Sequence, residues 1–250
     1  MAEVDATVSA FIWNYVLPWA LVIIILNYIN SYIYSPYKAA YAWLLNRLGF
    51  HMAKKAYRKK ERLFSSLAKL HVDGRPLDIL EIGVGGGTNF EYYPPGSNLI
   101  CIDPNPHFEK YLKDNHSKYP HVNLKGFVVG TAEKLHGFHD NSADAIVCTF
   151  VLCSVEDIEE VLKEIKRVLR PGGKFYFLEH VLADKNTHPW VYKMQNFIRP
   201  VWKWVGDGCE FQDTALHIEK AGFSHVDQEH FNSAIKFKLI QPMLMGTATK

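Results

Sequence analysis

The sequence lacks the short motifs that mark several common classes of protein. Its four cysteines, at positions 101, 148, 153 and 209, form no Cys-x-x-Cys pair, and its 12 histidines include no His-Glu-x-x-His motif. Spacing alone therefore predicts no metal site and no disulfide framework, and in a cytosolic domain the thiols should be reduced. No Gly-Lys-Ser or Gly-Lys-Thr ends a glycine-rich loop, which excludes a P-loop.

Charged residues are absent from residues 6–37, and residues 10–29 are almost entirely apolar. Twenty residues of helix measure about 30 Å, the thickness of a membrane's hydrocarbon core. A signal peptide would begin with basic residues and end at small ones, whereas this segment follows Glu3 and Asp5. We therefore predict a retained membrane anchor. A buried core helix, or a bent hairpin lying in one leaflet around Pro18, is the alternative.

Positive charge is concentrated beside this apolar segment. Residues 1–62 contain eight Lys or Arg and three Asp or Glu, a net charge of +5, whereas residues 63–250 have a net charge of −3. The positive-inside tendency then predicts that the folded domain faces the cytosol. The slightly acidic remainder argues against nucleic acid as a partner. We predict two parts, an anchor and interfacial segment at residues 1–50 and a folded domain at residues 51–250.

The most informative motif is a glycine-rich turn between two acids. Glu81 is followed by Gly83, Gly85 and Gly87 at alternate positions, and Asp103 ends the next apolar run. A strand, a glycine turn, a helix start and an acid at the tip of the second strand are typical of a Rossmann-like nucleoside site.

The third glycine of a dinucleotide fingerprint is missing, because Thr88 occupies its place. The pattern Glu-x-Gly-x-Gly-x-Gly instead resembles the S-adenosylmethionine loop of class I methyltransferases. A carboxylate at Glu81 suits the ammonium and sulfonium of that cofactor and would repel a pyrophosphate. Asp103 is expected to accept hydrogen bonds from both ribose hydroxyls.

The rest of the chain alternates between strand-like and helix-like patterns. We expect strands ending at Glu81 and Asp103, further strands at residues 124–129, 143–149 and 174–181, helices at 51–70, 105–116 and 155–169, and a final antiparallel pair at 223–231 and 237–245. This order predicts an α/β, Rossmann-like class I methyltransferase fold: a mostly parallel seven-stranded sheet with helices on both faces, preceded by an N-terminal membrane-anchoring helix.

Two further segments should line the cofactor cleft, which lies beyond the carboxyl ends of parallel strands. Ala132 and Glu133 follow the third strand, where a small residue and an acid suit the adenine edge. Cys148 and Thr149 close the fourth strand and should face the methionine end of the cofactor. Core packing is the simpler interpretation for Cys148 and for Cys153.

Several longer motifs resemble one family, the methyltransferase-like seven group of microsomal alkyl-thiol methyltransferases. They lie at residues 89–96, 103–110, 148–155, 168–173, 179–181 and 205–209. The Asp-Pro-Asn-Pro-His-Phe-Glu and Gly-Asp-Gly-Cys pieces are the most specific. Val84 and Gly86 depart from the family, which more often has Cys and Thr there, but both are expected at backbone-contact positions.

The resemblance implies methyl transfer from S-adenosylmethionine to small lipophilic thiols, and residence in the endoplasmic reticulum membrane, facing the cytosol, and on lipid droplets. A thiol is partly ionised at neutral pH and needs little help from a base. His180 and Asp207 are the candidate catalytic helpers, with structural roles as the alternative for each. A methyltransferase acting on a lipid, quinone or amine, and a non-catalytic membrane protein that kept the fold, are the competing functions.

Overall fold

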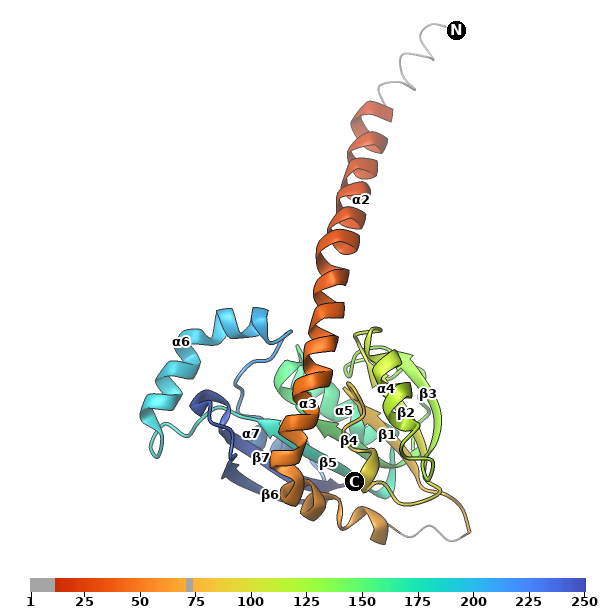
Figure 1. Cartoon of the computed structure of the whole chain (residues 1–250), viewed down its shortest axis with the longest axis vertical. Coiled ribbons are helices and arrows are strands. Elements are labelled where there is room, and N and C mark those ends of the chain that lie inside the picture. Colours follow the sequence, from red (N-terminus) through yellow and green to blue (C-terminus); the bar gives the residue numbers. More distant parts are fainter. Residues whose placement is uncertain (1–11, 71–73) are drawn as a thin grey trace, which may run out of the picture. The chain divides into compact units, whose positions relative to one another are not determined.

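The computed structural model describes residues 12–70 and 74–250. The chain divides into two units, Met1–Leu44 and Leu45–Lys250. Within the described residues, the first unit contains a π-helical turn (Ile12–Val16), helix α2 (Leu17–Ile29), a second π-helical turn (Asn30–Tyr34) and the start of helix α3 (Ser35–Phe64) (Figure 1). The helix expected at residues 51–70 is the second half of α3 as far as Phe64, and a separate 3-10 turn follows at Leu67–Lys69.

Apolar side chains of the first unit are largely exposed. Trp13, Trp19 and Ile24 are between 63% and 69% exposed, and most of the described side chains around them are exposed as well. None of the helices in the described part of the chain combines the length and the apolar character needed to cross a membrane.

The second unit is built on one seven-stranded sheet. Its strands are β1 (Asp78–Ile82), β2 (Asn98–Asp103), β3 (Asn123–Val129), β4 (Ala143–Thr149), β5 (Leu169–His180), β6 (His225–Asn232) and β7 (Pro242–Thr249), in the order β3-β2-β1-β4-β5-β7-β6. The first five strands are parallel, and β7 runs antiparallel to both β5 and β6. The predicted mostly parallel, seven-stranded α/β fold is confirmed.

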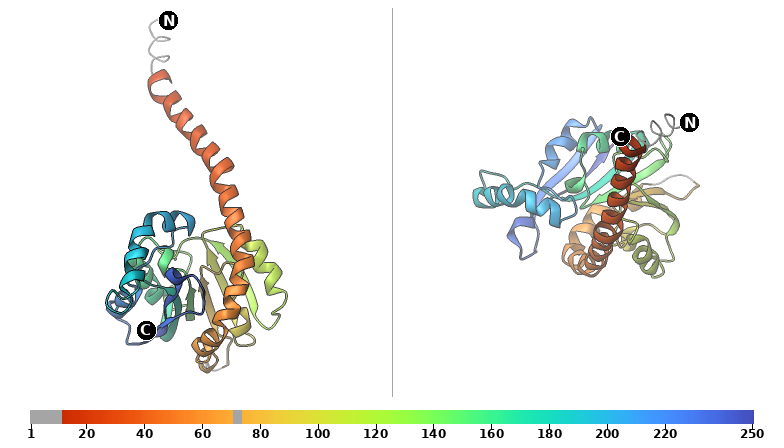
Figure 2. Two further views of the ribbon diagram at one scale, coloured as in Figure 1. Left: turned by 60° about the vertical axis from the view of Figure 1, so that its left-hand side comes forward. Right: turned by 90° about the horizontal axis from the view of Figure 1, so that it is seen from above.

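Helices cover both faces of this sheet (Figures 1 and 2). Helices α5 (Ile158–Val168) and α7 (Thr214–Lys220) pack against one face, in a core that includes Ile146 and Phe177. The end of α3 and helix α4 (Phe108–His116) pack against the other face, around Val147 and Tyr176. The alternation of Ile146, Val147 and their neighbours between the two cores is the period-two pattern of a strand buried on both sides.

Some boundaries differ from those expected. Strand β5 begins at Leu169 rather than at residue 174, because the Pro-Gly-Gly segment is already part of the strand. Strand β7 begins at Pro242 rather than at residue 237, because Lys238–Ile240 forms a 3-10 turn. Helix α7 was not predicted, since its seven residues are too short to show a helical period; Asp213 caps it by accepting the Leu216 amide.

Candidate active site

The predicted site residues gather at the carboxyl edge of the parallel strands. Strand β1 lies between β2 and β4, so the chain runs outward in opposite directions from the β1–β4 pair. Open α/β sheets bind their ligands in the crevice at such a switch point. Glu81, Asp103, Thr149 and His180 lie at the ends of β1, β2, β4 and β5, and all four therefore belong to this edge.

The glycine loop takes a conformation that other residues rarely adopt. Gly83, Gly85 and Gly87 have φ values of 66°, 52° and 77°, all in the left-handed region. A Cβ atom at Gly83 would overlap the Cγ2 atom of Val151, in the segment that follows β4. The loop therefore needs glycine at this position both for its backbone angle and for its close approach to the next strand end.

Asp103 holds the glycine loop to the end of β2. Its Oδ2 atom accepts the Gly85 amide at 3.0 Å, and its Oδ1 atom accepts the Asn105 amide at 2.9 Å. A carboxylate fixed by two amides keeps lone pairs for further donors and cannot rotate away from them. This is the geometry expected of a ribose-binding acid, and the ribose role stays a prediction.

Glu81 is the centre of a buried polar network that the sequence did not reveal. Its two carboxylate oxygens accept the Asn89 amide at 2.8 Å and the Tyr93 hydroxyl at 2.7 Å. Lys60, from α3, donates to Asn89 Oδ1 at 2.7 Å and to Thr88 Oγ1 at 3.0 Å. Lys60 and Glu81 are each only 1% exposed.

Burial favours the uncharged form of both groups and shifts the pKa of each accordingly. It raises the pKa of Glu81 to about 7, against the opposing effect of the Tyr93 and Asn89 hydrogen bonds. It lowers the pKa of Lys60 to about 8, against the attraction of Glu81. Lys60 is one of the basic residues concentrated in residues 1–62, and nothing in its spacing from Arg58 or Arg62 signals its burial.

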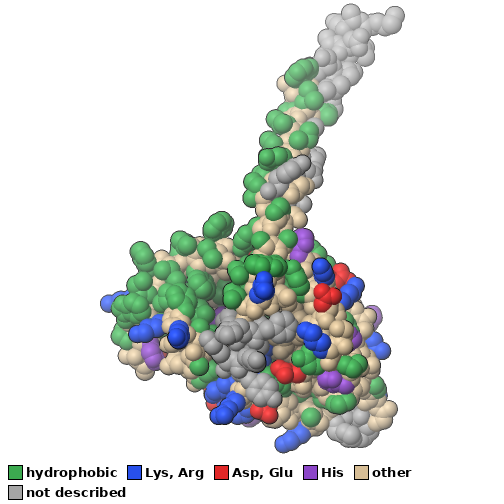
Figure 3. Space-filling model, in the orientation of Figure 1, with side chains coloured by type: hydrophobic (Ala, Val, Ile, Leu, Met, Phe, Trp, Pro, Cys, Tyr) green, Lys and Arg blue, Asp and Glu red, His purple; other side chains and the backbone are tan. Residues whose placement is uncertain are grey.

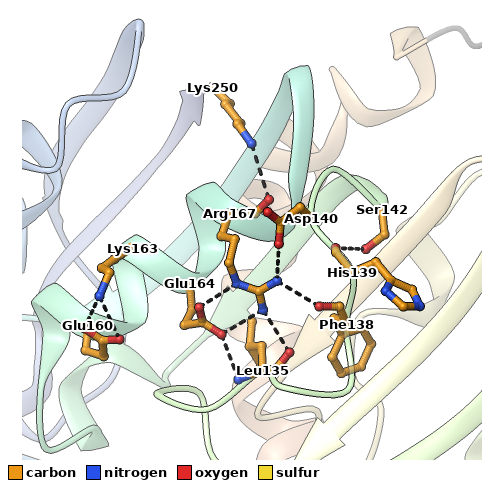
Figure 4. A network of polar contacts seen from close by, with 10 residues as sticks. All are labelled: Leu135, Phe138, His139, Asp140, Ser142, Glu160, Lys163, Glu164, Arg167 and Lys250. Atoms are coloured by element: carbon orange, nitrogen blue, oxygen red, sulfur yellow. Dashed lines mark hydrogen bonds and ion pairs between the residues drawn. The ribbon is translucent and has the colours of Figure 1, made fainter.

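The segment that carries Ala132 and Glu133 is fixed to helix α5. Figure 4 shows Arg167 donating to the carbonyl oxygens of Leu135 and Phe138, at 3.0 and 2.9 Å. Ala132 is buried in the core, and the Glu133 carboxylate accepts the Glu156 amide at 2.9 Å. The structure thus gives this segment a fixed path after β3, and its contact with an adenine stays a prediction.

The end of β4 offers backbone and hydroxyl groups rather than a thiol. The Cys148 side chain is fully buried in the sheet core, and burial holds its pKa well above the usual range. Thr149 Oγ1 accepts the Asn89 amide at 3.1 Å, which joins this strand end to the Glu81 network. Phe150 follows with φ of 63°, a costly angle for an aromatic residue and one typical of functional sites.

His180 lies beside two cysteines that are distant in the sequence. Cys153 follows β4, and Cys209 follows helix α6 (Pro189–Val205). One donor atom from each of the three side chains lies within 4.8 Å of the other two, and the Sγ atoms of Cys153 and Cys209 are 3.5 Å apart. Asp207 lies in the same turn as Cys209, with φ of 53°. The catalytic roles of His180 and Asp207 stay predictions.

This cluster bears on the prediction of no metal site, because its three side chains could hold a metal ion. No spacing rule could find it, since Cys153, His180 and Cys209 come from three separate segments that only the parallel sheet brings together. The wall next to it is aromatic: Trp202 Nε1 donates to Cys209 Sγ at 3.4 Å, and the Trp202 ring stacks on Phe211 with 5.6 Å between centroids.

Comparison with known proteins shows what the chain is similar to. A model of the methyltransferase domain family matches residues 80–177, which include the glycine loop and Asp103 but not His180. Human thiol S-methyltransferase TMT1A is 42% identical over 193 residues, which cover 77% of this chain and 78% of that protein. Rat thiol S-methyltransferase TMT1B is 38% identical over 214 residues, with coverage of 85% and 87%.

Solved structures agree at the level of the fold. A protein from Thermotoga maritima, described as a SAM-dependent methyltransferase and possible histamine N-methyltransferase, gives a TM-score of 0.57. The match covers 84% of this chain and 97% of that chain, at 21% sequence identity.

Proposed function

This chain belongs to the family of S-adenosylmethionine-dependent thiol S-methyltransferases, and from that premise we propose that it methylates the sulfur of small lipophilic thiols. The observation that carries the proposal is the 42% identity to the human thiol S-methyltransferase over more than three quarters of both chains. The carboxyl edge of the sheet supports it with residues that fit the cofactor.

The fit to S-adenosylmethionine rests on three features of the site. The glycine loop has three positions that carry no side chain of their own, Asp103 is fixed by two amides at the tip of β2, and Glu81 is a buried carboxylate near the tip of β1. An acid suits the ammonium and sulfonium of this cofactor, and the paired acceptors of Asp103 suit a ribose. When bound, the cofactor supplies an electrophilic methyl group.

The chain's own contribution to the reaction is alignment and the exclusion of water. Methyl transfer is a displacement in line with the breaking bond, so its rate depends on holding the acceptor sulfur against the methyl group. Val151 lies against the glycine loop, and the Phe150 amide donates a hydrogen bond to the Leu178 carbonyl at 2.8 Å, so this segment is well placed to hold the acceptor against the cofactor.

The surroundings of Cys209 support a lipophilic acceptor. Trp202, Phe211, Leu239 and Ile240 belong to one apolar cluster together with the inner face of α6. Burying a carboxylate or ammonium against such a wall would cost several kcal/mol unless it were paired. Apolar thiols should therefore be better acceptors than glutathione or cysteine.

Product analysis tests the proposed function. The full-length protein is incubated with methyl-labelled S-adenosylmethionine and a mixture of alkyl and aryl thiols, glutathione, amines, phenols and a quinone precursor. Mass spectrometry should find the label on the sulfur of the apolar thiols. Preference for glutathione, or for amine, phenol or carbon acceptors over every apolar thiol, would show that the acceptor class is wrong.

The raised pKa of Glu81 predicts that cofactor binding depends on pH. Only the carboxylate form attracts the cofactor's positive charge, and that form increases as pH rises through about 7. We expect affinity for S-adenosylmethionine to rise about eightfold between pH 6 and pH 7.5 by proton linkage. Calorimetry at several pH values measures this effect. Glu81→Gln should bind S-adenosylmethionine more weakly, and its affinity should no longer depend on pH in this range. If this variant kept the pH profile of the parent protein, the dependence would belong to another group.

We also propose that the protein acts at the endoplasmic reticulum membrane, with the catalytic domain facing the cytosol, and on lipid droplets. The exposed apolar side chains of α2 and the excess of positive charge in residues 1–62 support membrane association. Helix α6 supports it independently. Phe197, Val201 and Trp204 lie on one stripe and are 80%, 66% and 76% exposed, and Figure 3 shows hydrophobic side chains gathered over this part of the domain.

The exposed stripe of α6 predicts a second contact with lipid. The double variant Phe197→Ser and Trp204→Ser should bind phospholipid vesicles about tenfold more weakly, because two large side chains lose their transfer free energy. Vesicle flotation at limiting lipid measures the change. Leu216→Ser, on the surface of α7, is the matched control and should bind like the parent protein. Equal flotation of all three proteins would restrict lipid contact to the N-terminal segment.

A further inference from the structure

The Cys153–His180–Cys209 cluster has the composition and spacing of an open zinc site. Zinc in proteins favours cysteine and histidine ligands, and catalytic zinc sites use three of them and leave the fourth position open. Two thiolates on one tetrahedral zinc lie about 3.8 Å apart, given a Zn–S length of about 2.3 Å. The two Sγ atoms here are 3.5 Å apart, and one donor atom of His180 lies within 4.8 Å of each.

His180 supplies a second, independent observation. The residue is 9% exposed, and its Nε2 atom is buried without a hydrogen-bond partner among the described residues. An unpaired polar atom in a buried site is unfavourable and calls for an explanation. A metal ion held with the two neighbouring sulfurs would supply the missing partner.

The residues around the cluster hold its side chains and backbone in place, as the residues that surround the ligands of a metal site do. Trp202 Nε1 donates to Cys209 Sγ, and N–H donors of this kind stabilise ligating thiolates. Cys153 lies in a turn whose backbone is held by Glu179, because that carboxylate accepts the Val151 amide at 2.9 Å.

The cluster also lies close to the glycine loop. Cys153 is two residues from Val151, which lies against Gly83, and the Phe150 ring lies beside the His180 ring, tilted by 31° with 4.6 Å between centroids. A ligand held by the cluster would therefore lie next to Phe150 and Val151, the segment that joins the end of β4 to the glycine loop. A zinc ion with a purely structural role would not need to lie beside Phe150 and Val151.

We propose that Cys153, His180 and Cys209 bind one zinc ion, and that the acceptor thiol becomes its fourth ligand. The inference rests on the proposed function, since it names the way in which the same site takes its substrate. The thiol S–H bond breaks when the sulfur binds zinc, and the proton leaves to solvent. The zinc-bound sulfur then forms the new S–CH₃ bond while the cofactor's C–S⁺ bond breaks, its electron pair remaining on the cofactor sulfur. The thioether product is a weak zinc ligand and dissociates.

Metal analysis and cobalt spectroscopy test this proposal on the full-length protein in detergent, purified without chelator and dialysed against zinc. We expect about one zinc ion per chain, as for a single three-ligand site. Cys153→Ser, Cys209→Ser and His180→Ala should each lose it, whereas Cys101→Ala, a buried cysteine outside the cluster, should keep it. Cobalt in place of zinc should show thiolate charge-transfer absorption that grows when an alkanethiol is added without cofactor.

Several results would overturn the proposal. They are parent protein without bound zinc, zinc retained in all three variants, a disulfide between Cys153 and Cys209 in peptide mapping, or a cobalt spectrum that does not respond to thiol. The cobalt titration needs only the parent protein, so misfolding of a variant does not weaken the test. Undiminished thiol methylation by fully metal-free protein would reject the zinc and leave the proposed function intact. A thiol-responsive cobalt spectrum without any thiol methylation would reject the proposed function instead.

Discussion

Replacing Asp103 with alanine is expected to lower the affinity for S-adenosylmethionine about a hundredfold, while the domain remains folded. Each hydrogen bond to a charged acceptor contributes about 1.5–3 kcal/mol, and 1.4 kcal/mol corresponds to a factor of ten. The variant also frees the Gly85 and Asn105 amides that the carboxylate holds, so the loop loses its preformed geometry. Calorimetric titration measures the affinity, and circular dichroism with a thermal scan measures folding.

Asp78→Ala is the matched control for this experiment. Asp78 is also an acid in the sheet, and it accepts hydrogen bonds from Arg75, Asn98 and Arg170 at 3.0–3.1 Å. It lies at the opposite, amino end of β1, so its loss should lower stability without changing cofactor affinity. Equal affinities in the Asp103 variant and the parent protein would remove Asp103 from the binding site.

The strands that end in the site were predictable because each is a short apolar run that stops at a polar residue. Asp103 ends β2 as expected, β1 ends at Ile82, one residue beyond Glu81, and the bounds of β4 were predicted residue for residue. Buried parallel strands leave this pattern in the sequence, since both of their faces need apolar side chains. The same reasoning gave the position of the glycine loop between β1 and the next element.

The interior polar network could not be predicted in the same way. Lys60 precedes Glu81 by 21 residues, and its burial follows from the packing of α3 against the sheet rather than from any local pattern. A lysine in a basic run is normally solvated, and the burial of this one is tolerable because Thr88 and Asn89 accept its hydrogen bonds and Glu81 lies nearby.

The Cys153–His180–Cys209 cluster could not be predicted from the sequence for a related reason. Spacing rules for metal sites detect ligands that are close in sequence, whereas Cys153, His180 and Cys209 are brought together by the ends of β4, β5 and α6. Each residue by itself fits core packing or a turn. Their common location becomes visible only when the strand order is known.

Gly83→Ala is expected to abolish measurable binding of S-adenosylmethionine and to destabilise the domain by several kcal/mol. A φ of 66° costs an alanine about 1–2 kcal/mol, and the new methyl group would overlap Val151 Cγ2, so the loop must move or the segment after β4 must shift. Either movement separates the cofactor loop from the acceptor side. Calorimetry measures binding and thermal unfolding measures stability.

Two further variants separate the steric effect from the backbone effect. Gly96→Ala changes a glycine with φ of 81° whose new Cβ would meet nothing within 4 Å, so it should show the backbone cost without loss of binding. Gly83→Ala combined with Val151→Ala removes the overlapping methyl group and should recover part of the lost binding and stability, because residues in contact are not energetically additive. If the losses of binding and stability in the two single variants simply added in the double variant, the close approach of Gly83 to Val151 would not be the reason why this loop requires glycine.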